Sequence, residues 1–162
     1  MMMKEWRKKI WIFIIAVSLF AAYYISNHWF QLILIQGDSM YPAYHNMQLA
    51  VICRSEKEYQ IGDVIAFRCD GLNATLVKRI VACGGDRVQI KDGHLYVNGE
   101  ISPVYPEDTP FEYAGIAASE IVLQGGEVFV IGDNVGESKD SRYEEVGVID
   151  EGEFIGKVII AL

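Results

Sequence analysis

The feature that most constrains this chain is an uncharged, apolar run of about seventeen residues near its N-terminus. Residues 10–26 read IWIFIIAVSLFAAYYIS. An α-helix rises about 1.5 Å per residue, so this run reaches roughly 25 Å, which is at the short end of a membrane span. His28, Trp29 and Phe30 follow, and aromatic side chains of this kind suit a membrane interface. The sequence therefore predicts one transmembrane helix, with its interface residues, over residues 10–30.

The charges around this run predict its orientation. Residues 1–9 carry four Lys or Arg and one Glu, a net +3 in a chain whose formal net charge is −8. Basic residues usually stay on the cytoplasmic side of a membrane helix. We therefore expect a single-pass protein of the cell membrane that contacts lipid through its helix, with a cytoplasmic tip (1–9) and an extracytoplasmic domain (31–162). A cleaved signal peptide is the alternative, but the run ends in Tyr-Tyr-Ile-Ser-Asn rather than in a small-x-small site.

The rest of the chain has the pattern of β structure. Short apolar runs rich in Val, Ile, Phe and Tyr are broken about every ten residues by Gly, Asp and Asn. Residues 87–97 predict a β-hairpin, because two alternating segments flank Asp92 and Gly93, which tolerate a positive φ. Residues 102–126 contain three prolines and predict a long excursion, with a helical turn around residues 113–119. The predicted fold is mostly β, an antiparallel β-barrel or sandwich-like domain behind one N-terminal transmembrane helix.

Composition argues against two kinds of site. An acidic net charge does not suit a nucleic-acid binder, which presents clustered Lys and Arg to phosphates. Cys53, Cys69 and Cys83 lack the close spacing of a zinc site or a CxxC redox motif. We interpret them as free thiols, with a single disulfide as the alternative. No metal, other cofactor or nucleic acid is expected.

Three polar segments interrupt the strand pattern, and the first contains Ser39. Residues 37–42 read Gly-Asp-Ser-Met-Tyr-Pro and follow an apolar run. The glycine permits close approach of another backbone and the proline stiffens the turn, so the serine hydroxyl would have a fixed direction. Taken alone, the segment is better explained as an ordinary turn, because Gly, Asp, Ser and Pro all favour turns.

The second segment contains Lys78, which interrupts an apolar run over residues 74–82. Either face of such a strand places the lysine beside aliphatic side chains. Burial lowers the pKa of a lysine, so its neutral amine becomes available as the base that a serine nucleophile needs. The alternative is an edge-strand lysine that prevents aggregation. A Ser-Lys pair requires no histidine, and His28, His45 and His94 lie where we expect solvent.

The three segments together resemble those of the type I signal peptidases, membrane-bound serine proteases that remove signal peptides from exported proteins. The family form Ser-Met-x-Pro matches residues 39–42. Lys-Arg with an aliphatic residue and a later Gly-Asp match residues 78–80 and 85–86. Gly-Asp-Asn followed by Ser-x-Asp-Ser-Arg matches residues 132–134 and 138–142. The resemblance covers the apolar run and nearly the whole domain, with the motifs in the family's order.

This resemblance implies a set of site residues. Ser39 would be the nucleophile, with its main-chain amide as an oxyanion donor, and Lys78 would be the general base. The supporting positions would be Ser138, Asp133, Asp140, Arg142 and Gly37. Of these, Ser138 would hydrogen-bond the lysine amine, and Asp140 and Arg142 would form an ion pair that holds the third segment.

The expected partner is the signal peptide of an exported preprotein. It would lie extended beside the strand before Ser39 and the strand that ends at Lys78, and it would pair with them through main-chain hydrogen bonds. Its small side chains would enter shallow pockets, although core packing is the alternative role for each pocket residue. The expected pocket residues are Ile33, Ile35, Met40, Tyr44 and Val77.

Two departures from the family pattern leave alternatives open. Gly37 stands where some members have a second oxyanion hydroxyl, so the second donor is open. Residues 42–44 read Pro-Ala-Tyr where the family commonly reads Pro-Thr-Leu, so Tyr44 would reshape the pocket. A peptidase dedicated to one substrate, such as a pilin, is therefore one alternative, and an inactive membrane-anchored module that binds extended peptides is another. The sequence indicates no oligomeric state.

Overall fold

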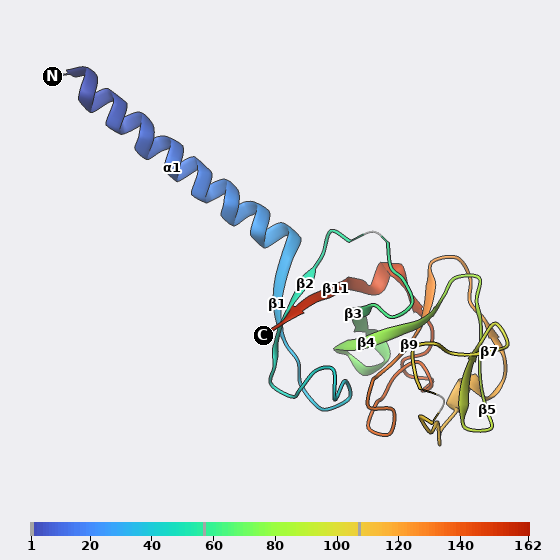
Figure 1. The fold of residues 1–162 in the computed structure, drawn as a ribbon. Coiled ribbons are helices and arrows are strands. Elements are labelled where there is room, and N and C mark those ends of the chain that lie inside the picture. The colour runs from blue at the N-terminus through green and yellow to red at the C-terminus, as the bar shows by residue number, and fades with distance from the viewer. Residues whose placement is uncertain (1, 57, 107) are drawn as a thin grey trace.

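The computed structural model describes residues 2–56, 58–106 and 108–162, and it describes no side chains for residues 2–5 and 25–27. One long helix is followed by a β domain with short 3-10 helices in its loops (Figure 1). In chain order the helix and strands are α1 (Met2–Trp29), β1 (Phe30–Leu34), β2 (Leu49–Cys53), β3 (Val64–Cys69), β4 (Ala74–Cys83), β5 (Arg87–Lys91), β6 (His94–Val97), β7 (Glu100–Ile101), β8 (Ile121–Val122), β9 (Glu127–Ile131), β10 (Ile149–Asp150) and β11 (Phe154–Ala161). The 3-10 helices are η1 (Asp70–Leu72), η2 (Gly115–Ala118) and η3 (Glu151–Glu153).

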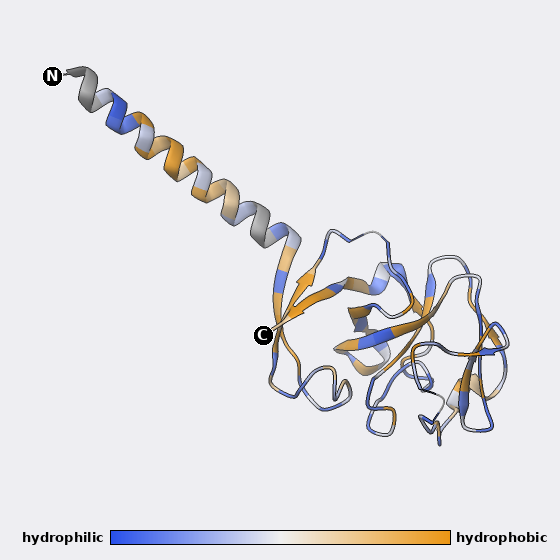
Figure 2. Ribbon diagram, in the orientation of Figure 1, coloured by the Kyte–Doolittle hydropathy of each residue, from blue (hydrophilic) through white to orange (hydrophobic). Residues whose placement is uncertain are grey.

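The helix α1 projects away from the β domain and continues directly into β1 (Figure 1). Its described side chains, residues 6–24, are exposed, and Figure 2 shows hydrophobic residues along its middle. The predicted span over residues 10–30 falls on this helix, except that Phe30 already belongs to β1. The side chains of residues 25–27, which are part of that span, lie outside the described set. Within the described residues, no helix combines the length and the hydrophobicity needed to cross a membrane.

The larger sheet has seven strands in the order β1-β2-β11-β3-β4-β9-β10, and every neighbouring pair is antiparallel. β11 lies between β2 and β3, so it joins the β1–β2 pair to the β3–β4 pair. Because direction alternates at each step, β1 and β4 run in the same direction. Within the described part of the chain β9 pairs with β4 only from Arg79 onward, and β1 pairs only with β2. Residues 74–78 of β4 and the outer side of β1 are therefore free sheet edges.

The smaller sheet has four strands in the order β7-β6-β5-β8. Its β5–β6 hairpin turns at Asp92 and Gly93, whose φ values are 50° and 78°, which confirms the hairpin predicted over residues 87–97. The predicted excursion after it contains η2 at the position expected for a helical turn. The prediction of a mostly β, antiparallel domain is confirmed.

Three apolar clusters hold the two sheets and their loops together. One contains buried residues of both sheets and of the excursion, including Phe129, Leu95 and Phe111. A second lies on the larger sheet around Phe67. The third contains Met40, which is 1 % exposed, and it packs the loop after β1 onto β2, β3 and β11. This third cluster fixes the loop that carries Ser39.

The cysteines add no cross-link to this fold. Cys53, Cys69 and Cys83 are all free thiols, as their spacing indicates. The described residues contain no group of His, Cys, Asp and Glu arranged to hold a metal ion.

Candidate active site

Ser39 and Lys78 meet at the site, although they come from different parts of the chain. Ser39 lies in the loop after β1, and Lys78 lies on β4 opposite Ile65 of β3. The Lys78 Nζ donates a hydrogen bond of 2.7 Å to Ser39 Oγ. Lys78 is only 3 % exposed, whereas Ser39 is partly buried and reachable from solvent. The two side chains are thus in direct contact.

Burial changes the chemistry of the Lys78 amine. It lowers the pKa of Lys78 from its ordinary value of 10.5 to about 8, because the charged form is poorly solvated there. The carboxylates of Asp140 and Asp133 raise this pKa part of the way, and the Arg142 guanidinium lowers it. At pH 7 a group with a pKa of 8 is neutral about one-tenth of the time, against roughly 0.03 % for a pKa of 10.5. A neutral amine at this distance can accept the proton of the Ser39 hydroxyl.

The loop that carries Ser39 is held by the segment that follows β9. The Asn134 N–H donates to the Ser39 main-chain oxygen at 3.0 Å, and Asn134 Nδ2 donates to the Asp38 main-chain oxygen at 3.1 Å. Gly132 lies so close to this loop that a Cβ there would overlap the Ser39 oxygen and Ser138 Oγ. The Gly-Asp-Asn motif is therefore the support of the serine loop.

The main chain beside Ser39 offers one free donor. The Ser39 N–H has no acceptor within the described part of the chain. Gly37 has a φ of 86°, which favours glycine, and its N–H already donates to Asn46 Oδ1 at 2.9 Å. The Ser39 amide is thus available to an oxyanion, whereas the Gly37 amide is occupied.

A buried ion pair organises the third segment. Arg142 Nε donates to Asp140 Oδ1 at 2.7 Å, and these side chains are 2 % and 0 % exposed. Asp140 Oδ2 also accepts from Arg142 Nη2 at 2.9 Å and from the Gly132 N–H at 3.1 Å. Arg142 Nη2 donates further to the main-chain oxygens of Val135 and Ser138, at 2.7 and 3.2 Å. These hydrogen bonds offset the desolvation of the pair and close residues 132–142 into one rigid loop.

Ser138 is buried in this loop, beside Gly132. Its Oγ has no hydrogen-bond partner among the described residues. The hydrogen bond expected between Ser138 and the lysine amine is therefore not formed, and the Lys78 Nζ donates to Ser39 Oγ.

Asp133, a supporting residue predicted from the sequence, forms an ion pair with Arg79, which the sequence did not predict as a site residue. Two Arg79 nitrogens bind the two Asp133 carboxylate oxygens, at 2.7 and 2.5 Å, and Arg79 Nη1 donates to the Gly62 main-chain oxygen at 2.7 Å. Arg79 follows Lys78 on β4, so the two side chains point to opposite sides of the strand. This alternation along the strand is the feature of the sequence that indicates a contact for Arg79 with a segment other than the serine loop.

A groove of about 390 Å³ opens beside Ser39 and Lys78. Four of the five expected pocket residues line it, namely Ile33, Ile35, Met40 and Val77. The other described residues that line it are Gln31, Leu34, Gln36, Thr75, Leu76 and Ile155. Most of these side chains come from β1 and from the free edge of β4, so the larger sheet curls to bring its two free edges to one groove.

The fifth expected pocket residue, Tyr44, is not among the described residues that line this groove. It packs against the apolar cluster around Met40. The Tyr44 N–H donates to the Met40 main-chain oxygen at 2.8 Å, and this turn carries the ring toward Arg79 and Asp133. Burial raises the pKa of Tyr44 there.

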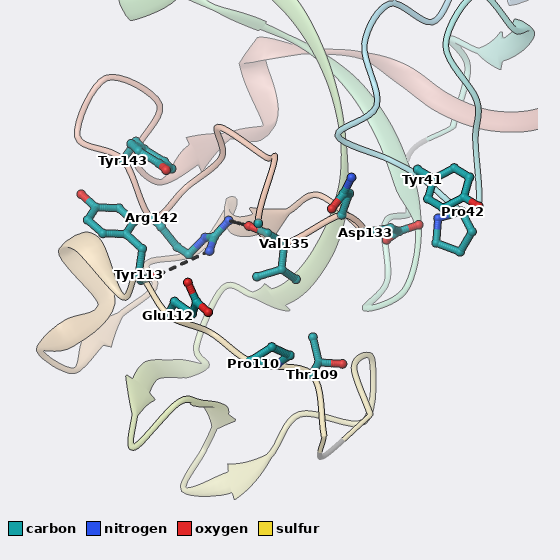
Figure 3. Close-up of a pocket in the computed structure, with 12 residues that line it drawn as sticks. Tyr41, Pro42, Thr109, Pro110, Glu112, Tyr113, Asp133, Val135, Arg142 and Tyr143 are labelled. Atoms are coloured by element: carbon teal, nitrogen blue, oxygen red, sulfur yellow. Dashed lines mark hydrogen bonds between the residues drawn. The ribbon is translucent and has the colours of Figure 1, made fainter.

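A second hollow is lined by Tyr41 and Pro42, which follow Ser39 and Met40 in the serine loop (Figure 3). Its volume is about 490 Å³. In Figure 3, Tyr41 and Pro42 form one wall, Thr109 and Pro110 lie across from them, and Tyr143 lies near the far end. None of the residues that line it also lines the groove.

Comparisons with known proteins identify the family of this chain. The model of the family described as "Signal peptidase, peptidase S26" matches residues 5–162. Signal peptidase I of Bacillus licheniformis is 30% identical, over 94% of this chain and 84% of the relative. Signal peptidase I of Bacillus amyloliquefaciens is 32% identical, over 94% and 81%. The crystal structure of a signal peptidase I from Enterococcus faecalis V583 superposes with a TM-score of 0.50 and 27% identity, covering 65% of this chain and 100% of that one.

Proposed function

The chain belongs to the signal peptidase family, peptidase S26, and from that premise we propose that it cleaves signal peptides from exported preproteins with Ser39 and Lys78 as a catalytic dyad. The family membership makes the chain a signal peptidase I, an enzyme class that removes signal peptides. The observation that carries the dyad is the 2.7 Å contact between Lys78 Nζ and Ser39 Oγ, at a place where burial lowers the lysine pKa to about 8.

In the acylation step, Ser39 Oγ attacks the carbonyl carbon of the bond to be cut while its proton passes to the neutral Lys78 amine. The carbonyl oxygen becomes an oxyanion, and the free Ser39 N–H is placed to donate to it. The tetrahedral intermediate collapses as the Lys78 ammonium gives its proton to the leaving amine. The mature protein leaves, and the signal peptide stays on Ser39 as an ester.

In the deacylation step, a water molecule takes the place of the departed amine. Lys78 accepts a proton from this water, whose oxygen attacks the ester carbonyl carbon. Collapse of the second intermediate breaks the bond to Ser39 Oγ, and the proton returns to that oxygen. The signal peptide leaves with a free carboxyl group, and the Ser39–Lys78 hydrogen bond is restored.

The substrate binds as an added strand in the groove. The free edges of β1 and of residues 74–78 of β4 both face this groove, so each can pair with an extended peptide. Ile33, Ile35 and Val77 give it an aliphatic lining, which suits the small apolar side chains before the cut. Met40 lies beneath the groove and is 1 % exposed.

We also propose that α1 anchors the enzyme in the membrane, with its N-terminus in the cytoplasm and the β domain outside. The support is the uncharged run over residues 10–26, the basic residues before it, and the exposure of the described helix side chains. Apolar side chains without a protein partner are stable in a lipid environment. The anchor would hold the site at the membrane surface from which signal peptides emerge.

The dyad is tested with single variants in the full chain. The parent, Ser39→Ala and Lys78→Ala enzymes are incubated in detergent with a purified precursor, and the mature product is followed by gel electrophoresis. Each variant is expected to lose about three orders of magnitude or more in kcat, since the nucleophile and its base act as one unit. The matched controls, Ser119→Ala and Lys139→Ala, change exposed side chains and are expected to keep parental rates. Parental activity in either dyad variant would refute the dyad.

The alternatives raised by the sequence lose their support. The dedicated peptidase rested on a pocket reshaped by Tyr44, whose ring lies outside the groove. The hydrogen-bond contact between Lys78 and Ser39 supports an active enzyme over an inactive peptide-binding module, which would not need it. A general signal peptidase fits this site best.

A further inference from the structure

The serine loop and β4 separate two hollows on the surface. Ser39 and Met40 line the groove, whereas the next two residues, Tyr41 and Pro42, line the hollow of Figure 3. On β4, residues 75–78 line the groove. The next residue, Arg79, lines a further compartment of about 790 Å³. The dyad therefore stands on the ridge between the groove and these two compartments.

The two compartments beyond the ridge form one cleft, which we call the far cleft. Their volumes are about 490 and 790 Å³, and Pro42, Thr109 and Asp133 line both of them. The far cleft runs between the serine loop and the excursion after β7, and each compartment has the size of an ordinary ligand site. No described residue lines both the far cleft and the groove.

The direction of the sheet leads a substrate from the groove into the far cleft. β1 and β4 run in the same direction, and both reach the dyad at the end of their groove-lining segments. A strand that lies along them with its signal-peptide residues in the groove must cross the ridge at Ser39. The residues after the cut then continue past Pro42 and Arg79, both of which line the far cleft.

The far cleft differs from the groove in chemistry. The groove has aliphatic side chains beside polar ones, including Gln31 and Gln36. The far cleft combines a largely apolar wall with the Arg79–Asp133 ion pair and the Thr109 side chain. It also contains Tyr105, which is 8 % exposed and whose hydroxyl has no hydrogen-bond partner among the described residues. Burial raises the pKa of Tyr105, so this hydroxyl stays protonated and can donate. A buried hydroxyl without a partner is unfavourable unless a ligand completes it.

We propose that the far cleft binds the first residues of the mature protein, and that the Tyr105 hydroxyl hydrogen-bonds a polar group of that segment. This inference rests on the proposed function, and it adds specificity on the carboxyl side of the bond that is cut. The enzyme then reads both sides of the cleavage site: small apolar residues in the groove, and an extended segment that offers a hydrogen-bond partner to Tyr105 in the far cleft.

The test compares two substrates that share one signal-peptide sequence. The first is a precursor whose mature part begins with Ser, Thr and Gln. The second is the same signal-peptide segment ending in a methyl ester, so that it carries no residue after the reacting carbonyl. Full-length parent, Tyr105→Phe and Thr109→Trp enzymes are assayed on both in detergent, with Tyr96→Phe on the smaller sheet as the matched control.

Tyr105→Phe is expected to lower kcat/KM for the precursor about threefold to tenfold, the range of one lost hydrogen bond, and to change ester hydrolysis less than about twofold. Thr109→Trp, which places a bulky side chain where the two compartments meet, is expected to lower kcat/KM for the precursor by more than about tenfold and to spare the ester. Tyr96→Phe is expected to leave both substrates at parental rates. Equal fold-changes on the two substrates in both cleft variants, or no change on either, would overturn the inference.

The same assay separates this inference from the proposed function. If Ser39→Ala cleaves the precursor and the ester as well as the parent does, the proposed function is refuted, and the inference falls with it. If ester hydrolysis depends on Ser39 while the cleft variants treat both substrates alike, only the inference is refuted.

Discussion

Replacing Lys78 by methionine should stabilise the fold while abolishing activity. Lys78 is buried, and its pKa falls from 10.5 to about 8. A difference of about 2.5 pKa units between the unfolded and folded states corresponds to about 3 kcal/mol of lost stability at pH 7. Methionine has a similar length and no charge to bury. Loss of the hydrogen bond to Ser39 costs about 1 kcal/mol of this gain. We therefore expect the free energy of unfolding of the variant to exceed that of the parent by about 2 kcal/mol.

The pH dependence of this gain follows from the direction of the shift. Because the folded-state pKa lies below the unfolded-state value, the unfavourable contribution of Lys78 is fully present below about pH 8. It declines as the pH rises toward 10.5, where both states lose the proton. At pH 10 the contribution of the charge is below about 1 kcal/mol, so the advantage of the Lys78→Met variant should vanish there.

The measurement is urea-induced unfolding of the full chain in detergent at pH 7 and pH 10, followed by near-ultraviolet circular dichroism. Lys139→Met is the control, because Lys139 is an exposed lysine paired with Glu145, and its replacement should change stability by less than about 1 kcal/mol at either pH. The reasoning fails if Lys78→Met is less stable than the parent at pH 7, or if its advantage is the same at pH 10.

Three further predictions concern the dyad and its support. The kcat/KM of the parent should rise with pH through an apparent pKa near 8 and level off above it, because only neutral Lys78 can act as the base; a profile that is flat between pH 6 and 9 would contradict this role. Asn134→Ala removes the side-chain hydrogen bond to the Asp38 main-chain oxygen and should lower kcat about tenfold, with KM changed less than about twofold in steady-state assays of the precursor. Asp140→Asn leaves Arg142 buried without its charge partner and should destabilise the fold by about 3 to 5 kcal/mol in urea unfolding, and a loss under about 1 kcal/mol would show that the ion pair is not what holds the loop.

The elements that the sequence predicted are those with a local signal. The hairpin over residues 87–97 was predictable because alternation and an Asp-Gly turn act over a few residues. The contact between Ser39 and Lys78 was expected only through the family resemblance, since nothing local links a turn serine to a strand lysine. The predicted bounds of the helix were less accurate. The predicted span ends at residue 30, whereas α1 ends at Trp29 and β1 begins at Phe30, and the apolar run carries no signal for this change.

The features that the sequence did not predict depend on contacts between distant segments. The pairing of Arg79 with Asp133 joins β4 to the loop after β9, and neither residue type alone indicates the other. Tyr44 was expected in the pocket because it occupies a position that lines the pocket in relatives, but the turn closed by Met40 carries its ring elsewhere. Tyr105 lies in a stretch without periodicity, so its burial required the fold to be known.

The place of β11 in the larger sheet sets the order in which this enzyme can become active during its synthesis. The ribosome makes β1 to β4 early, and with them both the serine loop and the strand that carries Lys78. No pairing joins β2 to β3 directly among the described strands, because β11 lies between them. A nascent chain that still lacks β11 therefore lacks the strand whose hydrogen bonds join the β1–β2 pair to the β3–β4 pair. If Ser39 and Lys78 act as proposed, we expect activity to appear only after β11 has been made and has paired with β2 and β3.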